Sequence, residues 1–237
     1  MSEVRALLLT DVVDSTKLSE QLGDEHMAGV WAAHDRVARD LLRLWRGREI
    51  DKTDGMLLMF DAAVDAVSYA RAYHRALAAL PVALKARAGL HVGPVVLREN
   101  DAADVALGAK PLEVDGLAKP TAARVMAVAG GGQTLLTAEA RDSLGEQTTW
   151  HVFSHGHWVM KGLGDPIELF EVGDAETAFQ LPAEGDKAHQ VVRVDDQWRP
   201  VQEIPNNLPQ QVTSFVGRER EVQAHDGSPV LPVRPKM

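Results

Sequence analysis

The first apolar stretch of the chain runs from Val4 to Leu9 and is bounded by polar residues. Its length and its continuous apolar character predict a buried strand, which delivers Asp11 at its C-terminal end. The side chains of Asp14, Ser15 and Thr16 are typical helix N-caps. Residues 24–45 then place apolar residues three and four apart, which predicts a long amphipathic helix that ends at Gly47.

The Asp-Gly pair at Asp54-Gly55 lies between two extended apolar runs. This pattern predicts a hairpin over residues 48–60 with Asp54 at its tip. Similar patterns predict helices over 62–80 and 117–129 and a strand over 134–137. They also predict two further hairpins, one from strands 82–92 and 95–97 and a last one from strands 150–159 and 167–172. Residues 99–111 are expected to form an irregular loop.

The order of these elements begins β-α-α-β-β-α-β, which is an α+β pattern with a split βαβ core. We therefore expect a ferredoxin-like antiparallel sheet with helices packed on one face. After Gly173 the composition shifts to Pro, Gln, Glu and Asp without periodicity. This shift predicts a folded domain over residues 1–173 and a linker or arm over 174–211.

Charge and cysteine content limit the functional classes. A net charge of −9 argues against a surface for nucleic acid or for an anionic membrane, since both need clustered Lys and Arg. The chain has no Cys, which excludes disulfides and thiolate metal sites and is compatible with a cytoplasmic location. The apolar run near the N-terminus is too short for a secretion signal, and no stretch is long enough to span a bilayer.

Asp11 and Asp54 are the first candidates for chemistry. If their strands lie side by side, the two carboxylates converge, and paired carboxylates on adjacent strands hold divalent cations in phosphoryl-transfer sites. Taken alone, each aspartate is more often a turn or capping residue.

Five segments of the chain favour a catalytic role for the two aspartates instead. They are LLLTDVVDST, DGMLLMF, GLHVGPV, Ala122-Ala123-Arg124 and MKGLGDPIELFEV. In order and spacing they resemble the catalytic domain of bacterial class III adenylate/guanylate cyclases, over residues 4–173. The resemblance implies conversion of a nucleoside triphosphate to a 3′,5′-cyclic nucleotide and pyrophosphate for intracellular signalling. It implies two Mg²⁺ or Mn²⁺ ions per site as cofactors.

The resemblance also implies roles for individual residues. Arg124 matches the arginine that stabilises charge on the α-phosphate, Lys161 a lysine that contacts phosphates, and Glu113 a residue that reads the base. The implied metal ligands are Asp11, Val12 and Asp54, and the implied phosphate cradle is Val12, Val13, Asp14, Ser15 and Thr16. Asp14 matches no metal carboxylate, so we expect it to cap the following helix.

Two positions depart from the family pattern. Pro120 stands where the family has an Asn that orients the ribose, and proline has neither an amide side chain nor a backbone N–H. The base-reading Lys aligns with Ile50, unless a shorter hairpin brings Lys52 into its place. We expect ATP as substrate, with GTP or a pyrimidine triphosphate as alternatives.

Such domains act as head-to-tail dimers, so the resemblance implies a homodimer with one protomer supplying Asp11 and Asp54 and the other Glu113 and Arg124. A catalytically weak nucleotide-binding domain and a pure dimerisation module are the remaining alternatives. His91 lies within a predicted strand, and we expect it to be a buried structural residue rather than a base.

The last segment has a separate resemblance. It is similar to the opening of a signal-transduction ATPase module that follows such cyclase domains. The similarity lies in NNLPQQVTSFVGRERE, and we assign residues 212–237 to this segment. No G-x-x-x-x-G-K-[ST] phosphate loop occurs in the chain, so we expect this segment to be a truncated and poorly ordered start of that module.

Overall fold

The computed structural model describes residues 2–145 and 149–203, and the predictions for residues 204–237 lie outside this part. The first half contains β1 (Ser2–Val12), α1 (Ser15–Leu22), α2 (Asp24–Leu44), β2 (Arg48–Lys52), β3 (Gly55–Phe60), α3 (Ala63–Ala78) and β4 (Ala86–Glu99). It continues with α4 (Ala102–Ala106), β5 (Leu112–Asp115), α5 (Ala118–Val128), β6 (Thr134–Thr137) and α6 (Ala138–Asp142). The last elements are β7 (His151–Met160), β8 (Ile167–Gly173), β9 (Ala188–Val194), β10 (Gln197–Pro200) and a 3-10 helix (Val201–Glu203).

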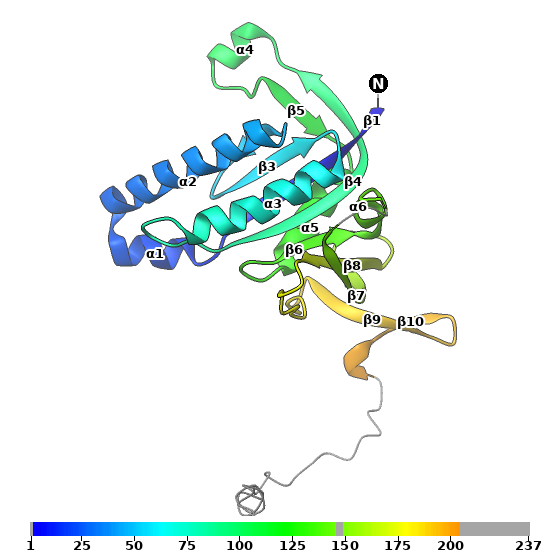
Figure 1. The fold of residues 1–237 in the computed structure, drawn as a ribbon. Helices are drawn as coiled ribbons and strands as arrows, with labels where there is room; N and C mark the ends of the chain where they lie inside the picture. The colour runs from blue at the N-terminus through cyan, green and yellow to red at the C-terminus, as the bar shows by residue number, and fades with distance from the viewer. Residues whose placement is uncertain (1, 146–148, 204–237) are drawn as a thin grey trace, which may run out of the picture. The chain divides into compact units, whose positions relative to one another are not determined.

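One sheet organises these elements in the order β10-β9-β7-β8-β6-β4-β1-β3-β2, with β5 paired to β4 (Figure 1). All pairs are antiparallel except β4 with β6. The predicted order β-α-α-β-β-α-β and the α+β class are confirmed. In the described residues, no helix has the length and apolar character that crossing a membrane requires.

Helices cover both faces of the sheet, and here the expectation of helices on one face is wrong. Ala6 and Leu8 of β1 belong to the same buried cluster as residues of α2 and α3, which lie side by side (Figure 1). Leu7 packs on the other face with Ala118 and Ala122 of α5. Because neighbouring residues of a strand point to opposite faces, the apolar run of β1 needs a cover on both sides.

The second predicted hairpin is also corrected, since residues 86–99 form one continuous strand. Pro94 does not end β4, because it lies between the residues that pair with β6 (88–90) and those that pair with β5 (96–99). A strand with a partner on only one side tolerates proline. The predicted irregular loop over 99–111 contains α4, which is capped by the Asp101 side chain accepting from the Asp104 N–H at 2.8 Å.

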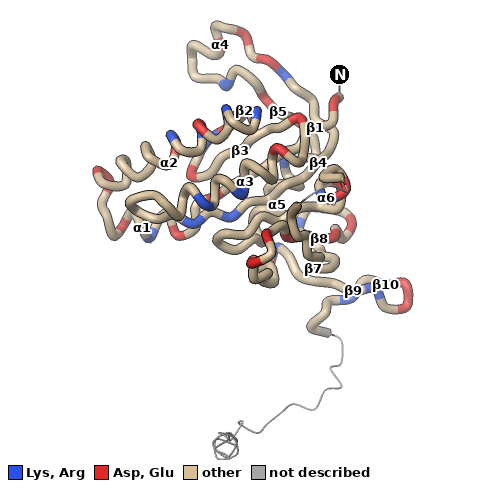
Figure 2. Tube along the Cα trace, in the orientation of Figure 1, with Lys and Arg blue, Asp and Glu red and all other residues tan. Residues whose placement is uncertain are grey.

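The predicted linker or arm over 174–211 contains regular structure in its described part. Residues 188–200 form the β9–β10 hairpin, and β9 extends the sheet by pairing with β7. Asp195 and Asp196 at the tip have φ of 49° and 60°, as a two-residue hairpin turn of the I′ type requires. These acidic residues mark the end of the hairpin in Figure 2.

Candidate functional site

Asp11 and Asp54 lie together because β1 and β3 are neighbours. Asp11 is opposite Gly55 in the antiparallel register, and Asp54 precedes Gly55 at the hairpin tip. A Cβ at Gly55 would lie 1.8 Å from the Thr10 carbonyl oxygen, so only glycine allows β1 to pass this close. Both carboxylates line one open cavity of about 830 Å³.

The loop from Val12 to Thr16 lines the same cavity and turns β1 into α1. Asp14 makes this turn with φ 58°, a left-handed conformation that Asp tolerates better than most residues. Asp14 is the N-cap residue of α1, as expected, and its backbone carbonyl accepts from the Leu18 N–H at 2.9 Å, whereas its side chain makes no capping hydrogen bond. The Val13 N–H donates to the Lys85 carbonyl at 2.9 Å. The backbone N–H groups of Asp14, Ser15 and Thr16 therefore lie at the helix N-terminus as the donors toward the cavity.

Sequence reasoning missed Lys17, Glu20 and Arg87 of this cavity, and Arg87 contacts Asp11 directly. It lies opposite Asp11 on β4, and its Nε and Nη2 donate to Asp11 Oδ2 at 2.9 and 2.6 Å. Its Nη1 donates to the Ala127 carbonyl at 3.3 Å. The sequence signal is a charged residue within an apolar strand, but only the β1–β4 register shows that it meets Asp11.

Arg124 and Lys161 are also brought together. Helix α5 lies directly on β4 at Gly89, where a Cβ would be 2.2 Å from the Met126 nitrogen. Arg124 Nε donates to the Lys161 carbonyl at 2.9 Å. Arg124 lines a separate hollow of about 410 Å³, which shares Arg87 with the aspartate cavity. Within one chain, Arg124 and the two aspartates therefore line different cavities.

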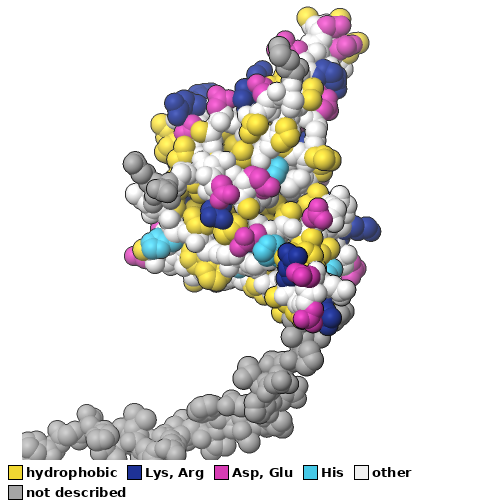
Figure 3. All heavy atoms as spheres, turned by 90° about the vertical axis from the view of Figure 1, so that its right-hand side faces the viewer, with side chains coloured by type: hydrophobic (Ala, Val, Ile, Leu, Met, Phe, Trp, Pro, Cys, Tyr) yellow, Lys and Arg dark blue, Asp and Glu magenta, His cyan; other side chains and the backbone are white. Residues whose placement is uncertain are grey.

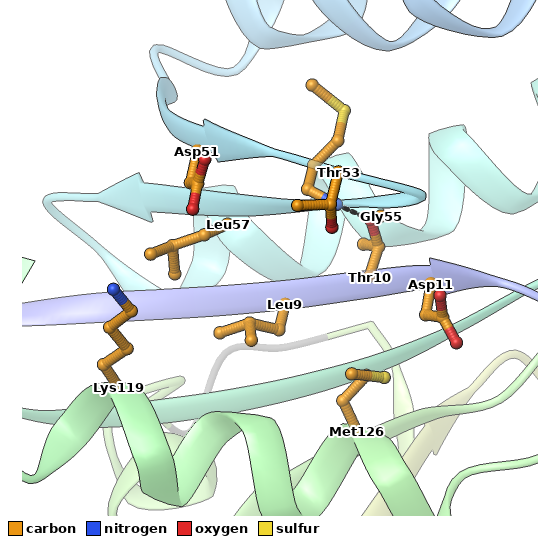
Figure 4. A pocket seen from close by; sticks show the side chains of 10 residues that line it. Leu9, Thr10, Asp11, Asp51, Thr53, Gly55, Leu57, Lys119 and Met126 are labelled. Carbon is orange, nitrogen blue, oxygen red and sulfur yellow. Dashed lines mark hydrogen bonds between the residues drawn. The ribbon is translucent and has the colours of Figure 1, made fainter. Parts of the chain in front are cut away.

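A third cavity, of about 160 Å³, lies between the β1 and β3 strands and α5 (Figure 4). Its lining residues are Leu9, Thr10, Asp11, Asp51, Thr53, Gly55, Met56, Leu57, Lys119 and Met126. Asp11 is common to this cavity and to the aspartate cavity. Apolar side chains form its middle, and Asp51 and Lys119 supply charge near one end (Figure 4).

The predicted base-reading residues do not line these three cavities. Ile50 is 7% exposed and packs in the core below α5. Lys52 Nζ lies 3.3 Å from Asp35 Oδ2 of α2. Glu113 alternates with Leu112 and Val114, whose side chains pack in the cluster below α5, so its side chain points to the opposite face.

Pro120 occupies the first turn of α5, where backbone N–H groups have no partner within the helix. It therefore fits the helix without breaking a hydrogen bond. It also offers no side-chain donor or acceptor at the position where the family has Asn.

Two histidines near the last strands and β4 have structural partners. His91 Nδ1 lies 2.9 Å from Thr137 Oγ1, and burial lowers the pKa of His91, in agreement with a structural role. His155 Nε2 lies 2.9 Å from Glu171 Oε2, and both side chains are almost fully buried. In residues 2–145 and 149–203, no group of three or more His, Cys, Asp or Glu is arranged to hold a metal.

Asp11 and Asp54 nevertheless fit a divalent cation, because both present hard oxygen donors to the same open cavity. The remaining ligand positions are available to substrate oxygens and water, as Mg²⁺ prefers.

On the face seen in Figure 3, Lys and Arg side chains are separated by acidic and apolar ones rather than gathered in a stripe.

Comparisons with known proteins bear on the fold of the chain. No protein-family model matches the chain. The chain is 26% identical over 184 residues to "Putative adenylate cyclase 3" of Rhizobium meliloti (strain 1021), which covers 75% of this chain. It spans only 29% of the length of that protein.

Solved structures show the same fold. Adenylate cyclases from Trypanosoma brucei in their monomeric state match with a TM-score of 0.67 and 21% identity, over 76% of this chain and 94% of theirs. The guanylate cyclase domain of RhGC from Catenaria anguillulae in complex with GTP matches with a TM-score of 0.66 and 15% identity, over 73% of this chain and 98% of that one. The cyclase resemblance seen in the sequence is therefore confirmed, and the chain has the fold of the class III adenylate/guanylate cyclase catalytic domain. The resemblance of residues 212–237 to an ATPase module stays a prediction.

Proposed function

We propose that this domain is a nucleotidyl cyclase, which converts a nucleoside triphosphate to a 3′,5′-cyclic nucleotide and pyrophosphate. The observation that carries the proposal is the convergence of Asp11 and Asp54 in one open cavity beside the start of α1. The likeness to adenylate and guanylate cyclases supports it.

Asp11 and Asp54 would hold two Mg²⁺ or Mn²⁺ ions, together with the main chain of Val12. Ions held there would supply a lower pKa for the ribose 3′-hydroxyl and charge neutralisation for the triphosphate. The amides of Asp14, Ser15 and Thr16 face the same cavity and favour the terminal phosphates.

The positions of Arg124 and Lys161 favour a site shared by two copies of the chain. Both residues would contact phosphate, yet Arg124 lines a hollow other than the aspartate cavity of its own chain. In a head-to-tail homodimer, Arg124 and Lys161 of one protomer complete the site of Asp11 and Asp54 of its partner. The twofold symmetry then gives two equivalent sites.

The test is incubation with each of the four nucleoside triphosphates and Mg²⁺ or Mn²⁺, with products identified by mass spectrometry. We expect a cyclic nucleotide and one equivalent of pyrophosphate from the preferred substrate. A folded, dimeric protein that forms no cyclic product from any of the four would contradict the proposal.

A second function, metal-dependent nucleotide binding with little turnover, is favoured by Pro120, which cannot orient the ribose through an amide side chain. Calorimetry with a non-cyclisable triphosphate analogue and Mn²⁺ separates the two cases. Tight binding without product formation would support the binding function over the cyclase.

A further inference from the structure

A buried histidine–tyrosine pair lies in the core between α2 and α3. His34 of α2 and Tyr73 of α3 are both fully buried, and His34 Nε2 lies 2.6 Å from the Tyr73 hydroxyl oxygen. Buried polar side chains cost stability unless they are hydrogen-bonded, and an apolar pair of the same shape can be as stable. Packing between the two helices therefore does not by itself require this pair.

Hydrogen-bond chemistry fixes the direction of each bond around the pair. His34 Nδ1 lies 2.9 Å from Asp35 Oδ1, and a carboxylate only accepts, so Nδ1 carries a proton. Burial lowers the pKa of His34, so the ring is neutral at pH 7 and Nε2 accepts from the Tyr73 O–H. Burial also raises the pKa of Tyr73, which keeps that proton in place. The Tyr73 oxygen has then used its one proton, so it accepts from the Thr10 hydroxyl.

This chain of hydrogen bonds reaches both strands that carry the proposed cation ligands. Thr10 directly precedes Asp11, and Thr10 Oγ1 accepts from the Met56 backbone N–H at 3.3 Å, the dashed line in Figure 4. Met56 follows Asp54 by two residues, on the β3 side of the hairpin tip. The Thr10 hydroxyl therefore joins β1 to β3 beside both carboxylates.

The other end of the chain reaches the same hairpin from β2. Asp35 Oδ2 lies 3.3 Å from Lys52 Nζ, and Lys52 precedes Asp54 by two residues. Lys52 faces α2 because Ile50 is an extra residue in β2, a bulge that reverses the alternation of the residues after it. Asp54 itself is exposed, so the position of its carboxylate follows from the position of the hairpin tip.

We propose that Tyr73, oriented by His34, is a positioning residue for the cation site, which rests on the role of the two aspartates in the proposed function. Tyr73 holds the Thr10 hydroxyl in one rotamer, and in that rotamer Thr10 holds the hairpin tip against β1. Without the Tyr73 hydroxyl, Thr10 is free to rotate and Asp54 can move relative to Asp11. Groups that orient metal ligands in this way strengthen metal binding without touching the ion.

The test measures Mn²⁺ binding to the nucleotide-free protein by electron paramagnetic resonance, which requires no turnover. Tyr73→Phe removes only the hydroxyl, and we expect it to weaken Mn²⁺ binding by about ten-fold. Thr10→Val should have a similar effect, whereas Thr10→Ser keeps the hydroxyl and should bind Mn²⁺ like the wild type. In an Asp54→Ala background, Tyr73→Phe should have no further effect, because the carboxylate that it positions is gone.

Tyr69→Phe is the matched control. Tyr69 lies one turn earlier on α3, is fully buried, and stacks on Tyr73 with the ring centroids 5.6 Å apart. Among the residues that the structure describes, none gives the Tyr69 hydroxyl a hydrogen bond. Its removal should therefore leave Mn²⁺ binding unchanged and the free energy of unfolding equal or higher.

The outcomes separate the positioning role from the proposed function. Wild-type Mn²⁺ binding in folded Tyr73→Phe would overturn the positioning role, while the cation role of the aspartates stands. An equal loss in Tyr69→Phe would also overturn it, because packing rather than the hydroxyl would then be responsible. Mn²⁺ binding that is unaffected by Asp54→Ala would overturn the cation role of that aspartate, and the positioning role with it.

Discussion

The aspartate cavity and the Arg124 hollow both contain charged side chains, and they are built in different ways. Asp11 and Asp54 are fixed by the hydrogen-bonded register of β1 and β3, with Gly55 allowing close contact. Arg124 is placed by a helix and by one hydrogen bond to the Lys161 carbonyl. Arg87 lies between the two regions and lines both. This separation within one chain is the reason to expect a site completed by a second copy.

Of all the changes predicted here, removing either aspartate should lower catalytic activity the most. Asp11→Ala or Asp54→Ala takes away a carboxylate that the proposed reaction needs for its cations, so kcat/KM should fall by about 10³-fold. Steady-state assays measure the loss, and circular dichroism shows whether the fold is retained. Near wild-type turnover in either folded variant would show that the reaction does not need these carboxylates.

Mixing variants tests whether the two regions act across a dimer. Asp54→Ala and Arg124→Ala homodimers should each be nearly inactive. After random subunit exchange about half of the dimers are mixed, and each has one intact site, so activity should recover to about a quarter of wild type. A mixture no more active than its components would show that each site is built within one chain.

Arg87→Met tests the residue between the two regions. Because Arg87 pairs with Asp11, removing its charge should raise the Mn²⁺ affinity of the nucleotide-free protein several-fold. The gain should stay below about ten-fold, since this pair is partly exposed and screened by solvent. Electron paramagnetic resonance titration measures the free Mn²⁺, with Arg39→Met as control. Weaker Mn²⁺ binding in Arg87→Met would instead mean that Arg87 orients Asp11 for the cation.

His74 on α3 belongs to neither region and should affect stability rather than turnover. Burial lowers its pKa to about 4, and Nε2 lies 2.9 Å from Thr134 Oγ1. Between pH 6.5 and 4 the unfolded chain binds a proton here that the folded protein does not, so acidification destabilises the fold. The loss from this group is about 3 kcal/mol over that range.

Urea unfolding at several pH values checks this prediction. His74→Gln cannot take up the proton, so the unfolding free energy should depend less steeply on pH in the variant. A residual slope from His34 and His91, whose pKa values burial also lowers, is expected. Equal slopes in wild type and variant would show that His74 has the same pKa in the folded and the unfolded protein.

The chain's local patterns predicted most elements near the aspartate cavity. The apolar run before Asp11, the Asp-Gly pair at Asp54 and the spacing of α2 depend on residues close in sequence. The β9–β10 hairpin was missed although VVRV and QWRP flank the two aspartates of its turn. The continuous β4 was missed because Pro94 reads as a break until its neighbouring strands are known.

The sequence by itself determined the order of the first seven elements, the α+β class and the two aspartates as candidates, because periodicity and turn chemistry are local properties. Only the tertiary structure decided which residues face each other. The pairing of Asp11 with Arg87 depends on β1–β4 register, and the position of Asp51 depends on one extra residue at Ile50. A shift of one residue moves every following side chain of a strand to the other face, and strand pairing sets that shift.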